Sequence, residues 1–185
     1  DIQSSMRSYF SKLQRERCCY CFQSLMKGGY CRQIEHVLPR VVYPRYSLHF
    51  WNLAVACERC NRIKKRASSQ AFLNTRTDYP AGDEFTKQYH PSFHHYDEHV
   101  KFYFLSTNRF SIASYIGLTD QGRDLCNQVL EECSLEMALT SNDPALAPSI
   151  EEIRNLLSLS DEKTVDRVIA FQRALESVLV QEARG

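Results

Sequence analysis

Residues 51–65 read WNLAVACERCNRIKK, and this stretch decides which fold we expect. The short apolar run Leu53–Ala56 predicts a buried strand. Two cysteines separated by two residues, Cys57 and Cys60, follow it directly, and the basic segment from about Asn61 predicts a helix. A strand, a cysteine pair and a helix in immediate succession indicate a small unit whose thiols lie at one edge.

A second pair of cysteines with the same spacing, Cys18 and Cys21, lies near the start of the chain. Two C-x-x-C pairs are typical of structural zinc, because each tight turn lets two thiolates reach one ion and four thiolates close a tetrahedron. A disulfide framework is disfavoured because the sequence shows no secretory signal. The spacing leaves open whether Cys19 or Cys31 replaces a neighbouring ligand. The predicted zinc ligands are Cys18, Cys21, Cys57 and Cys60.

The segment upstream of this stretch supplies a partner for the strand. Residues 30–37 predict a first strand, with Glu35 and His36 near its end. Apolar side chains at helical spacing predict a basic amphipathic helix over residues 6–17. Together these segments predict an α+β fold in which two strands and a helix carry cysteine pairs at their edges.

The near-neutral composition conceals two halves of opposite charge. The whole chain has a formal net charge of +1, with 23 Lys and Arg against 22 Asp and Glu. Residues 1–75 hold 13 basic and 4 acidic side chains, whereas residues 76–185 hold 10 and 18. A basic half is the electrostatic footprint expected for binding a phosphate backbone, and a solvated charged surface is the alternative.

Composition excludes several classes of protein. Hydrophobic residues make up 43% of the 185 residues and charged residues 24%, which are ordinary values for a globular chain. No apolar run approaches the roughly 20 residues that span a bilayer, and the first residues lack the pattern of a signal peptide. We therefore expect a globular, cytoplasmic protein with no membrane segment.

Two short segments carry a resemblance to a known family. IEHVLPR at residues 34–40 and the stretch at 51–65, in register with both cysteine pairs, resemble the HNH endonucleases, also called ββα-metal nucleases. The likeness covers about residues 18–66 and implies a ββα-metal core with a four-cysteine zinc site, followed by a mainly helical C-terminal region. Residues 89–123 resemble the tail of small stand-alone HNH proteins of bacterial anti-phage systems, including the nuclease subunit of Septu-type systems.

The resemblance assigns a role to four residues. His36 matches the general base, an imidazole that takes a proton from the attacking water. Glu35 and Asn61 match the positions that hold one catalytic cation, and their hard oxygen ligands suit Mg²⁺ or Mn²⁺. Asn52 matches a central asparagine that holds the loop and aligns the histidine. A geometric difficulty follows, because neighbours such as Glu35 and His36 face opposite sides of a regular strand.

Cationic side chains around this core are expected to contact DNA phosphates. An ordinary solvated face is the alternative, but their place beside the expected site favours phosphate contact. The expected DNA-binding residues are Arg40, Arg45, Arg62, Lys64, Lys65 and Arg66.

These expectations combine into one function and one alternative. The function is a metal-dependent HNH endonuclease that hydrolyses DNA phosphodiester bonds, with Zn²⁺ and Mg²⁺ or Mn²⁺ as cofactors and no small-molecule cofactor. By the same resemblance it is the nuclease effector of an anti-phage system beside an ATPase partner, which must be another chain because no Walker motif occurs here. The alternative is a non-catalytic zinc-knuckle module that binds nucleic acid or protein.

Four further histidines lie close together, at His90, His94, His95 and His99. Their spacing admits a second metal site, but a proline interrupts any helix through the first pair, so the ligands would diverge. We favour a role in packing for all four, and also for His49.

The rest of the chain predicts helices and a three-part organisation. Residues 1–75 form the expected nuclease core, residues 76–141 an extension packed on it, and residues 142–185 helices that pack on the body or dock on a partner protein. Cys126 and Cys133 lie in an expected helix, where we interpret them as small buried hydrophobic residues.

Overall fold

The computed structural model describes residues 1–25, 32–64, 70–73, 76–106 and 111–139, together with residues 173, 177 and 180. The chain divides into two compact units, Asp1–Lys101 with Tyr115–Cys133 and Phe102–Ser114 with Ser134–Gly185. Every described residue of the expected site belongs to the first unit. The helices predicted over 142–185 fall almost wholly outside the described residues, and the three-part division stays a prediction.

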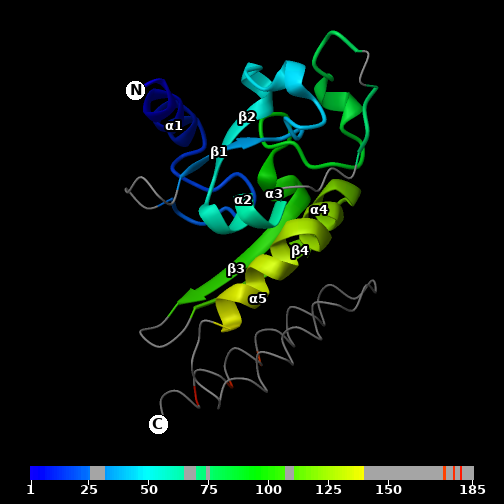
Figure 1. Ribbon diagram of the computed structural model, residues 1–185. Coiled ribbons are helices and arrows are strands. Elements are labelled where there is room, and N and C mark those ends of the chain that lie inside the picture. The colour runs from blue at the N-terminus through cyan, green and yellow to red at the C-terminus, as the bar shows by residue number, and fades with distance from the viewer. Residues whose placement is uncertain are drawn as a thin grey trace. The chain divides into compact units, whose positions relative to one another are not determined.

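Two short strands lie at the centre of the first unit (Figure 1). β1 (Gln33–His36) and β2 (Leu53–Ala56) run antiparallel, in a register that pairs His36 with Leu53. All four residues of β2 are buried, as expected for an apolar run. The second strand is therefore confirmed with its predicted limits.

Helix α2 (Glu58–Lys64) follows β2 after one residue, so the elements run strand, strand, helix. The helix begins between the two cysteines of the second pair, three residues before the predicted start at Asn61. Its first turn is closed by the Asn61 amide, which donates to the Cys57 carbonyl at 3.0 Å. As a result, Cys60 lies in the first turn of the helix, where it is buried.

Helix α1 (Ile2–Leu13) precedes the strands and is capped by Asp1, whose carboxylate accepts from the Gln3 amide at 3.1 Å. The helix begins and ends about four residues earlier than the predicted span of 6–17. It stops because Arg15 and Glu16 take left-handed conformations, with φ of 53° and 56°. The chain can then turn back toward the strands.

The side chain of Gln14 joins α1 to the sheet. Its Nε2 donates to the Val55 carbonyl and its Oε1 accepts from the Val55 amide, each at 2.7 Å. The side-chain amide thus satisfies both backbone groups on the open edge of β2, much as a neighbouring strand would. This pair fixes α1 against the strand that carries the second cysteine pair.

A mainly aromatic cluster is built on the loop between β1 and β2. Its buried members are Leu38, Tyr43, Tyr46 and Phe85, and Phe72, Tyr79 and Phe93 pack against them. Because the cluster joins residues from both sides of α2, it ties the segment around residues 72–93 to the strand–strand–helix unit.

The later elements complete the described chain. They are α3 (Tyr96–His99), β3 (Val100–Ser106), β4 (Ser111–Gly117), α4 (Asp120–Leu125), a π-helical turn (Cys126–Leu130) and α5 (Glu131–Leu139). β3 and β4 pair with each other as a second sheet. The helix expected to hold Cys126 and Cys133 is confirmed, with the π turn inside it. Within the described stretches, no helix combines the length and the apolar character needed to cross a membrane.

Candidate functional site

His36 closes β1 and faces the loop that leads to β2. Its Nε2 lies 3.0 Å from the carbonyl oxygen of Ser47. A carbonyl only accepts hydrogen bonds, so Nε2 carries the proton and the neutral ring has its lone pair on Nδ1. Burial lowers the pKa of His36, which keeps the ring neutral near pH 7. The side chain is therefore oriented and ready to accept a proton at Nδ1.

Asn52 holds the same loop from within and is completely buried. Its Oδ1 accepts from the Leu38 amide at 2.7 Å, and its Nδ2 donates to the carbonyls of Leu38 and Tyr46 at 3.1 and 3.0 Å. The side chain thereby fixes the start of the loop, just after His36, and the turn just before Ser47. Asn52 therefore determines where the Ser47 carbonyl meets the imidazole of His36.

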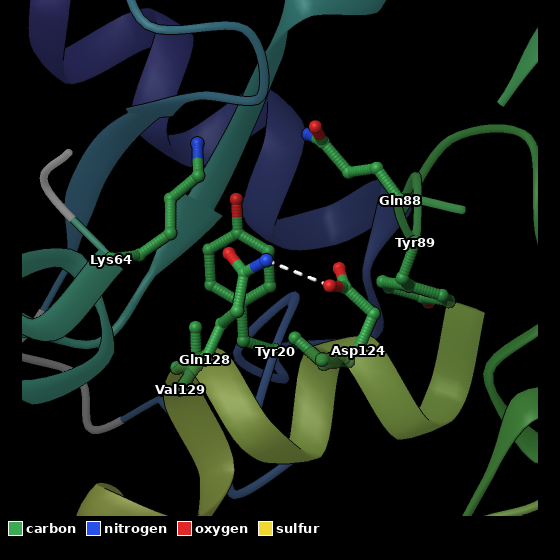
Figure 2. A pocket seen from close by; sticks show the side chains of 8 residues that line it. Tyr20, Lys64, Gln88, Tyr89, Asp124, Gln128 and Val129 are labelled. Atoms are coloured by element: carbon green, nitrogen blue, oxygen red, sulfur yellow. Dashed lines mark hydrogen bonds between the residues drawn. The ribbon is translucent and has the colours of Figure 1, made fainter. Parts of the chain in front are cut away.

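Glu35 lies in the interior, where it forms an ion pair with Lys64 of α2. The Lys64 ammonium also donates to the carbonyls of His36 and Val37, at 2.5 and 2.8 Å, and the Tyr20 hydroxyl donates to Glu35 at 2.9 Å. Figure 2 shows Lys64 and Tyr20 beside a small cavity, of about 20 Å³, roughly the room of one water molecule. Through Lys64, the buried ion pair is thus hydrogen-bonded to the backbone of His36.

This placement bears directly on the expected catalytic cation. Glu35 and His36 are consecutive residues of a regular strand, so their side chains point to opposite faces. Glu35 is already neutralised by Lys64, and in this arrangement it does not fit a cation shared with His36. Asn61 is half-buried at the start of α2, and its amide oxygen suits a hard cation. The structure does not bring Glu35 and His36 to one side of the strand.

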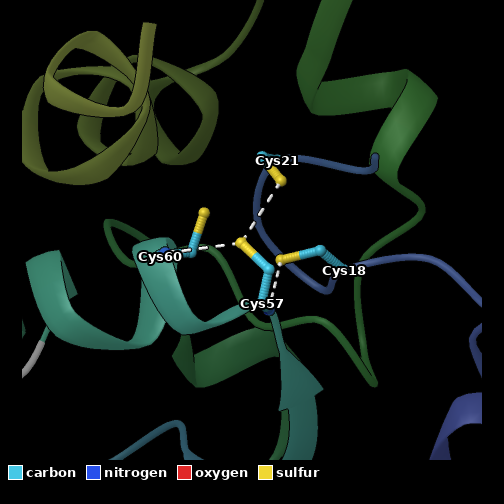
Figure 3. A group of neighbouring side chains, drawn as sticks. All are labelled: Cys18, Cys21, Cys57 and Cys60. Carbon is cyan, nitrogen blue, oxygen red and sulfur yellow. Dashed lines mark hydrogen bonds between the residues drawn. The ribbon is translucent and has the colours of Figure 1, made fainter. Parts of the chain in front are cut away.

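The four predicted cysteines come together, as Figure 3 shows. The Sγ atoms of Cys18, Cys21, Cys57 and Cys60 all lie within 4.8 Å of one another. A Zn–S bond of about 2.3 Å implies tetrahedron edges of about 3.8 Å, and the Sγ atoms of Cys21 and Cys57 are 3.9 Å apart. The cluster could therefore bind a metal such as zinc, as its donor set and spacing fit one.

Backbone amides support this cluster. The Cys57 amide donates to the Cys18 sulfur at 3.2 Å, and the Cys60 amide donates to the Cys57 sulfur at 3.4 Å. Such bonds stabilise thiolates and orient them toward an ion. Cys19 is buried outside the cluster, and Cys31 lies outside the described residues.

The side chains expected to contact DNA differ in their exposure to solvent. Arg40, Arg45 and Arg62 are exposed, as phosphate contacts require. Lys64 differs from the expectation, because its ammonium is buried and donates to three oxygens of the protein. Lys65 and Arg66 lie outside the described residues.

Comparison with known proteins shows a similarity that covers part of the chain. Over 72 residues, the chain is 29% identical to Septu protein PtuB of Bacillus thuringiensis. The aligned stretch is 38% of this chain and spans only 28% of that protein. No family model matches the chain, and no solved structure matches it.

Cys133 is a neighbour of the cysteine cluster that the sequence did not indicate. It is buried, as expected, but its Sγ lies 3.9 Å from the Sγ of Cys60. Hydrogen bonds from Cys21 and Cys60 lower the pKa of Cys133. Cys133 is thus buried as predicted, and it also contacts the cysteine cluster. Its place, far along the chain and outside any C-x-x-C pair, offered no signal.

His90 is a second feature whose partners the sequence did not show. It is completely buried, and its Nδ1 accepts from the Ser92 amide at 3.2 Å. Its Nε2 must therefore carry the proton and donate to the Tyr79 hydroxyl at 2.9 Å, which donates in turn to Asn52 Oδ1 at 3.1 Å. His90 thus supports the loop of His36 through two side chains.

Among the described residues, the cysteines form the one group with the geometry of a metal site.

Proposed function

We propose that this chain is an HNH-type endonuclease that hydrolyses phosphodiester bonds of DNA, with His36 as the general base. The observation that carries the proposal is the pairing of His36 Nε2 with the Ser47 carbonyl, which leaves the lone pair on Nδ1. A general base must be neutral and oriented before its substrate arrives, and the buried Asn52 holds the orienting loop.

The proposed reaction starts at the lone pair on Nδ1 of His36. Nδ1 of His36 takes a proton from a water molecule as the water attacks phosphorus, and the 3′ oxygen departs from the opposite side. By resemblance to HNH enzymes, the products carry 5′-phosphate and 3′-hydroxyl ends. Bound Mg²⁺ or Mn²⁺ would neutralise charge on the phosphate and on the departing oxygen. Asn61 is the proposed protein ligand, and Glu35 joins it only in a state in which Lys64 releases the carboxylate.

The four-cysteine cluster is proposed to hold structural zinc. Four thiolates leave no open coordination position, so the ion would hold Cys18 and Cys21 to the end of β2 and the start of α2. Exposed Arg40, Arg45 and Arg62, with Lys65 and Arg66, are the proposed phosphate contacts.

The proposed biological setting is anti-phage defence. The partial similarity to Septu protein PtuB supports it, together with the likeness of residues 89–123 to the tails of small defence nucleases. In this setting the chain acts in the cytoplasm as part of a complex with an ATPase subunit.

Relaxation of supercoiled plasmid tests the enzymatic proposal. The purified chain, with and without its ATPase partner, is incubated with Mg²⁺, with Mn²⁺, and with EDTA added after zinc has been quantified. Nicked or linear plasmid that forms only with the divalent cation supports the proposal. Plasmid that stays supercoiled under every condition, while the folded protein still binds it, supports the non-catalytic zinc module instead.

A further inference from the structure

A groove lined by aromatic, aliphatic and two polar side chains lies between α1 and the 3₁₀ turn Phe50–Asn52. Its volume is about 220 Å³, and it opens to solvent. The lining residues are Phe10, Leu13, Gln14, Phe50, Trp51, Leu53, Pro91 and Ser92. All of them belong to the first unit of the chain.

The aromatic rings form a continuous and partly exposed wall. The ring centroid of Phe50 lies 5.4 Å from that of Phe10 and 4.9 Å from that of Trp51. Tyr9 extends the wall, with its centroid 6.1 Å from that of Phe50. Phe50 and Trp51 are 42% and 43% exposed, and Leu13 is 58% exposed. Exposed apolar side chains gathered in one place mark a binding surface, whereas scattered ones need no explanation.

The charge around the groove favours a nucleic acid over a protein segment. No acidic residue lines it. Arg7 lies one turn before Phe10 on α1, and therefore on the same face of the helix. Six of its eight lining residues belong to residues 1–75, which carry 13 basic against 4 acidic side chains. Aromatic faces beside cationic side chains are the surfaces on which unpaired bases stack.

A backbone hydrogen bond links the turn that lines the groove to the strand of the candidate nuclease site. Phe50 and Trp51 precede Asn52 in a single 3₁₀ turn, and the Asn52 carbonyl accepts from the Val37 amide at 3.0 Å, directly after His36. Phe50 and Trp51 are therefore tied through Asn52 to the residue that follows His36.

We propose that this groove binds an unpaired base of the DNA substrate, stacked against Trp51 and Phe50. The inference rests on the proposed nuclease function and deepens it, because it makes DNA with a single-stranded or distorted segment the preferred substrate.

The chain offers a direct probe, because Trp51 is its single tryptophan. Full-length His36→Ala protein, which does not cut the strand, is titrated with a short single-stranded oligonucleotide while tryptophan fluorescence is recorded. The matched ligand is an abasic strand of the same length, which keeps every phosphate but has no bases. We expect saturable quenching by the normal strand, and roughly 5- to 150-fold weaker binding of the abasic strand, as expected for one stacked base.

Variants locate the contact. Phe50→Ala and Leu13→Ala should weaken binding of the normal strand and leave binding of the abasic strand unchanged. Val41→Ala, at an 89% exposed apolar residue outside the groove, is the control and should change neither. Circular dichroism confirms that each variant is folded.

Equal affinity for the normal and abasic strands, or fluorescence that does not respond to either, overturns the inference and points to a protein as the occupant of the groove. Its failure is distinguishable from failure of the proposed function. Plasmid cleavage without base-dependent quenching removes only the groove proposal, and base-dependent quenching without plasmid cleavage removes only the nuclease.

Discussion

The side chain of Asn52 pairs with both backbone groups of Leu38, accepting from its amide at 2.7 Å and donating to its carbonyl at 3.1 Å. These two hydrogen bonds resemble those that a neighbouring strand would make, although one buried side chain makes both. Asn52 therefore fixes the loop that orients His36, although Asn52 itself takes no part in proton transfer.

Removing this side chain should loosen the loop and destabilise the fold. Asn52→Ala removes the partner of the buried Leu38 amide and of the Leu38 carbonyl, and one of the two hydrogen bonds that the Tyr46 carbonyl accepts, so we expect a loss of roughly 2–4 kcal/mol in the free energy of unfolding. Urea denaturation measures the change. Asn61→Ala is the matched control, at a half-buried position, and should cost less than about 1 kcal/mol. Equal losses in the two variants would contradict the role given to Asn52.

The buried pair of Glu35 and Lys64 should be strongly coupled. Lys64→Met leaves the Glu35 carboxylate buried without its cation, which we expect to cost about 3–5 kcal/mol. The double variant Glu35→Met with Lys64→Met removes both charges and should recover much of that loss. Arg62→Met, at an exposed position of the same helix, serves as the control. Additive effects of the two single substitutions, measured by chemical denaturation, would refute a coupled pair.

Protonation of His90 should oppose folding in acid. Burial lowers the pKa of His90 to about 3, with a smaller contribution from His94, whereas the unfolded chain has its histidine pKa near 6.5. Between these values the unfolded state binds the proton and the folded state does not. Stability from neutral His90 is therefore complete above pH ~6.5 and is lost as pH falls toward 3, by up to about 1.4 kcal/mol per pH unit.

His90→Asn tests this pH dependence. The free energy of unfolding is measured between pH 5 and 7 with zinc in excess, for the variant and for the natural sequence. We expect a lower but flatter profile for the variant, because asparagine does not titrate. Parallel profiles would show that His90 is not the group whose protonation matters.

The zinc content of variants should show whether Cys133 is a ligand beside the four clustered cysteines. We expect one zinc per chain in the natural protein and in Cys133→Ser, because four other thiolates already complete a tetrahedron. Cys57→Ser combined with Cys60→Ser should lose the zinc and most of the folded protein. Cys126→Ser is the control for substitution of a buried thiol in the same helical stretch. Elemental analysis decides, and a Cys133→Ser protein without zinc would make Cys133 a ligand.

The elements that the sequence predicted well are those with local signals. The apolar run of β2 and the two cysteine pairs needed only neighbouring residues, and both were found where expected. The start of α2 was misplaced because the cysteine pair was treated as a turn, although Cys60 already belongs to the helix.

No sequence pattern could predict the pairing of Glu35 with Lys64. The two residues are far apart in the chain, and each alone is typical of a solvated charge. The same holds for the link from His90 through Tyr79 to Asn52, because it depends on how an aromatic cluster packs.

Cleavage by His36→Ala tests the central claim most directly. Rates of plasmid nicking are compared for the natural sequence, for His36→Ala and for His95→Ala, which replaces an exposed histidine away from the site. With Mg²⁺ present and folding verified, we predict a loss of at least about 100-fold for His36→Ala and no loss for His95→Ala. Undiminished nicking by a folded His36→Ala protein would contradict the assignment of His36 as the general base.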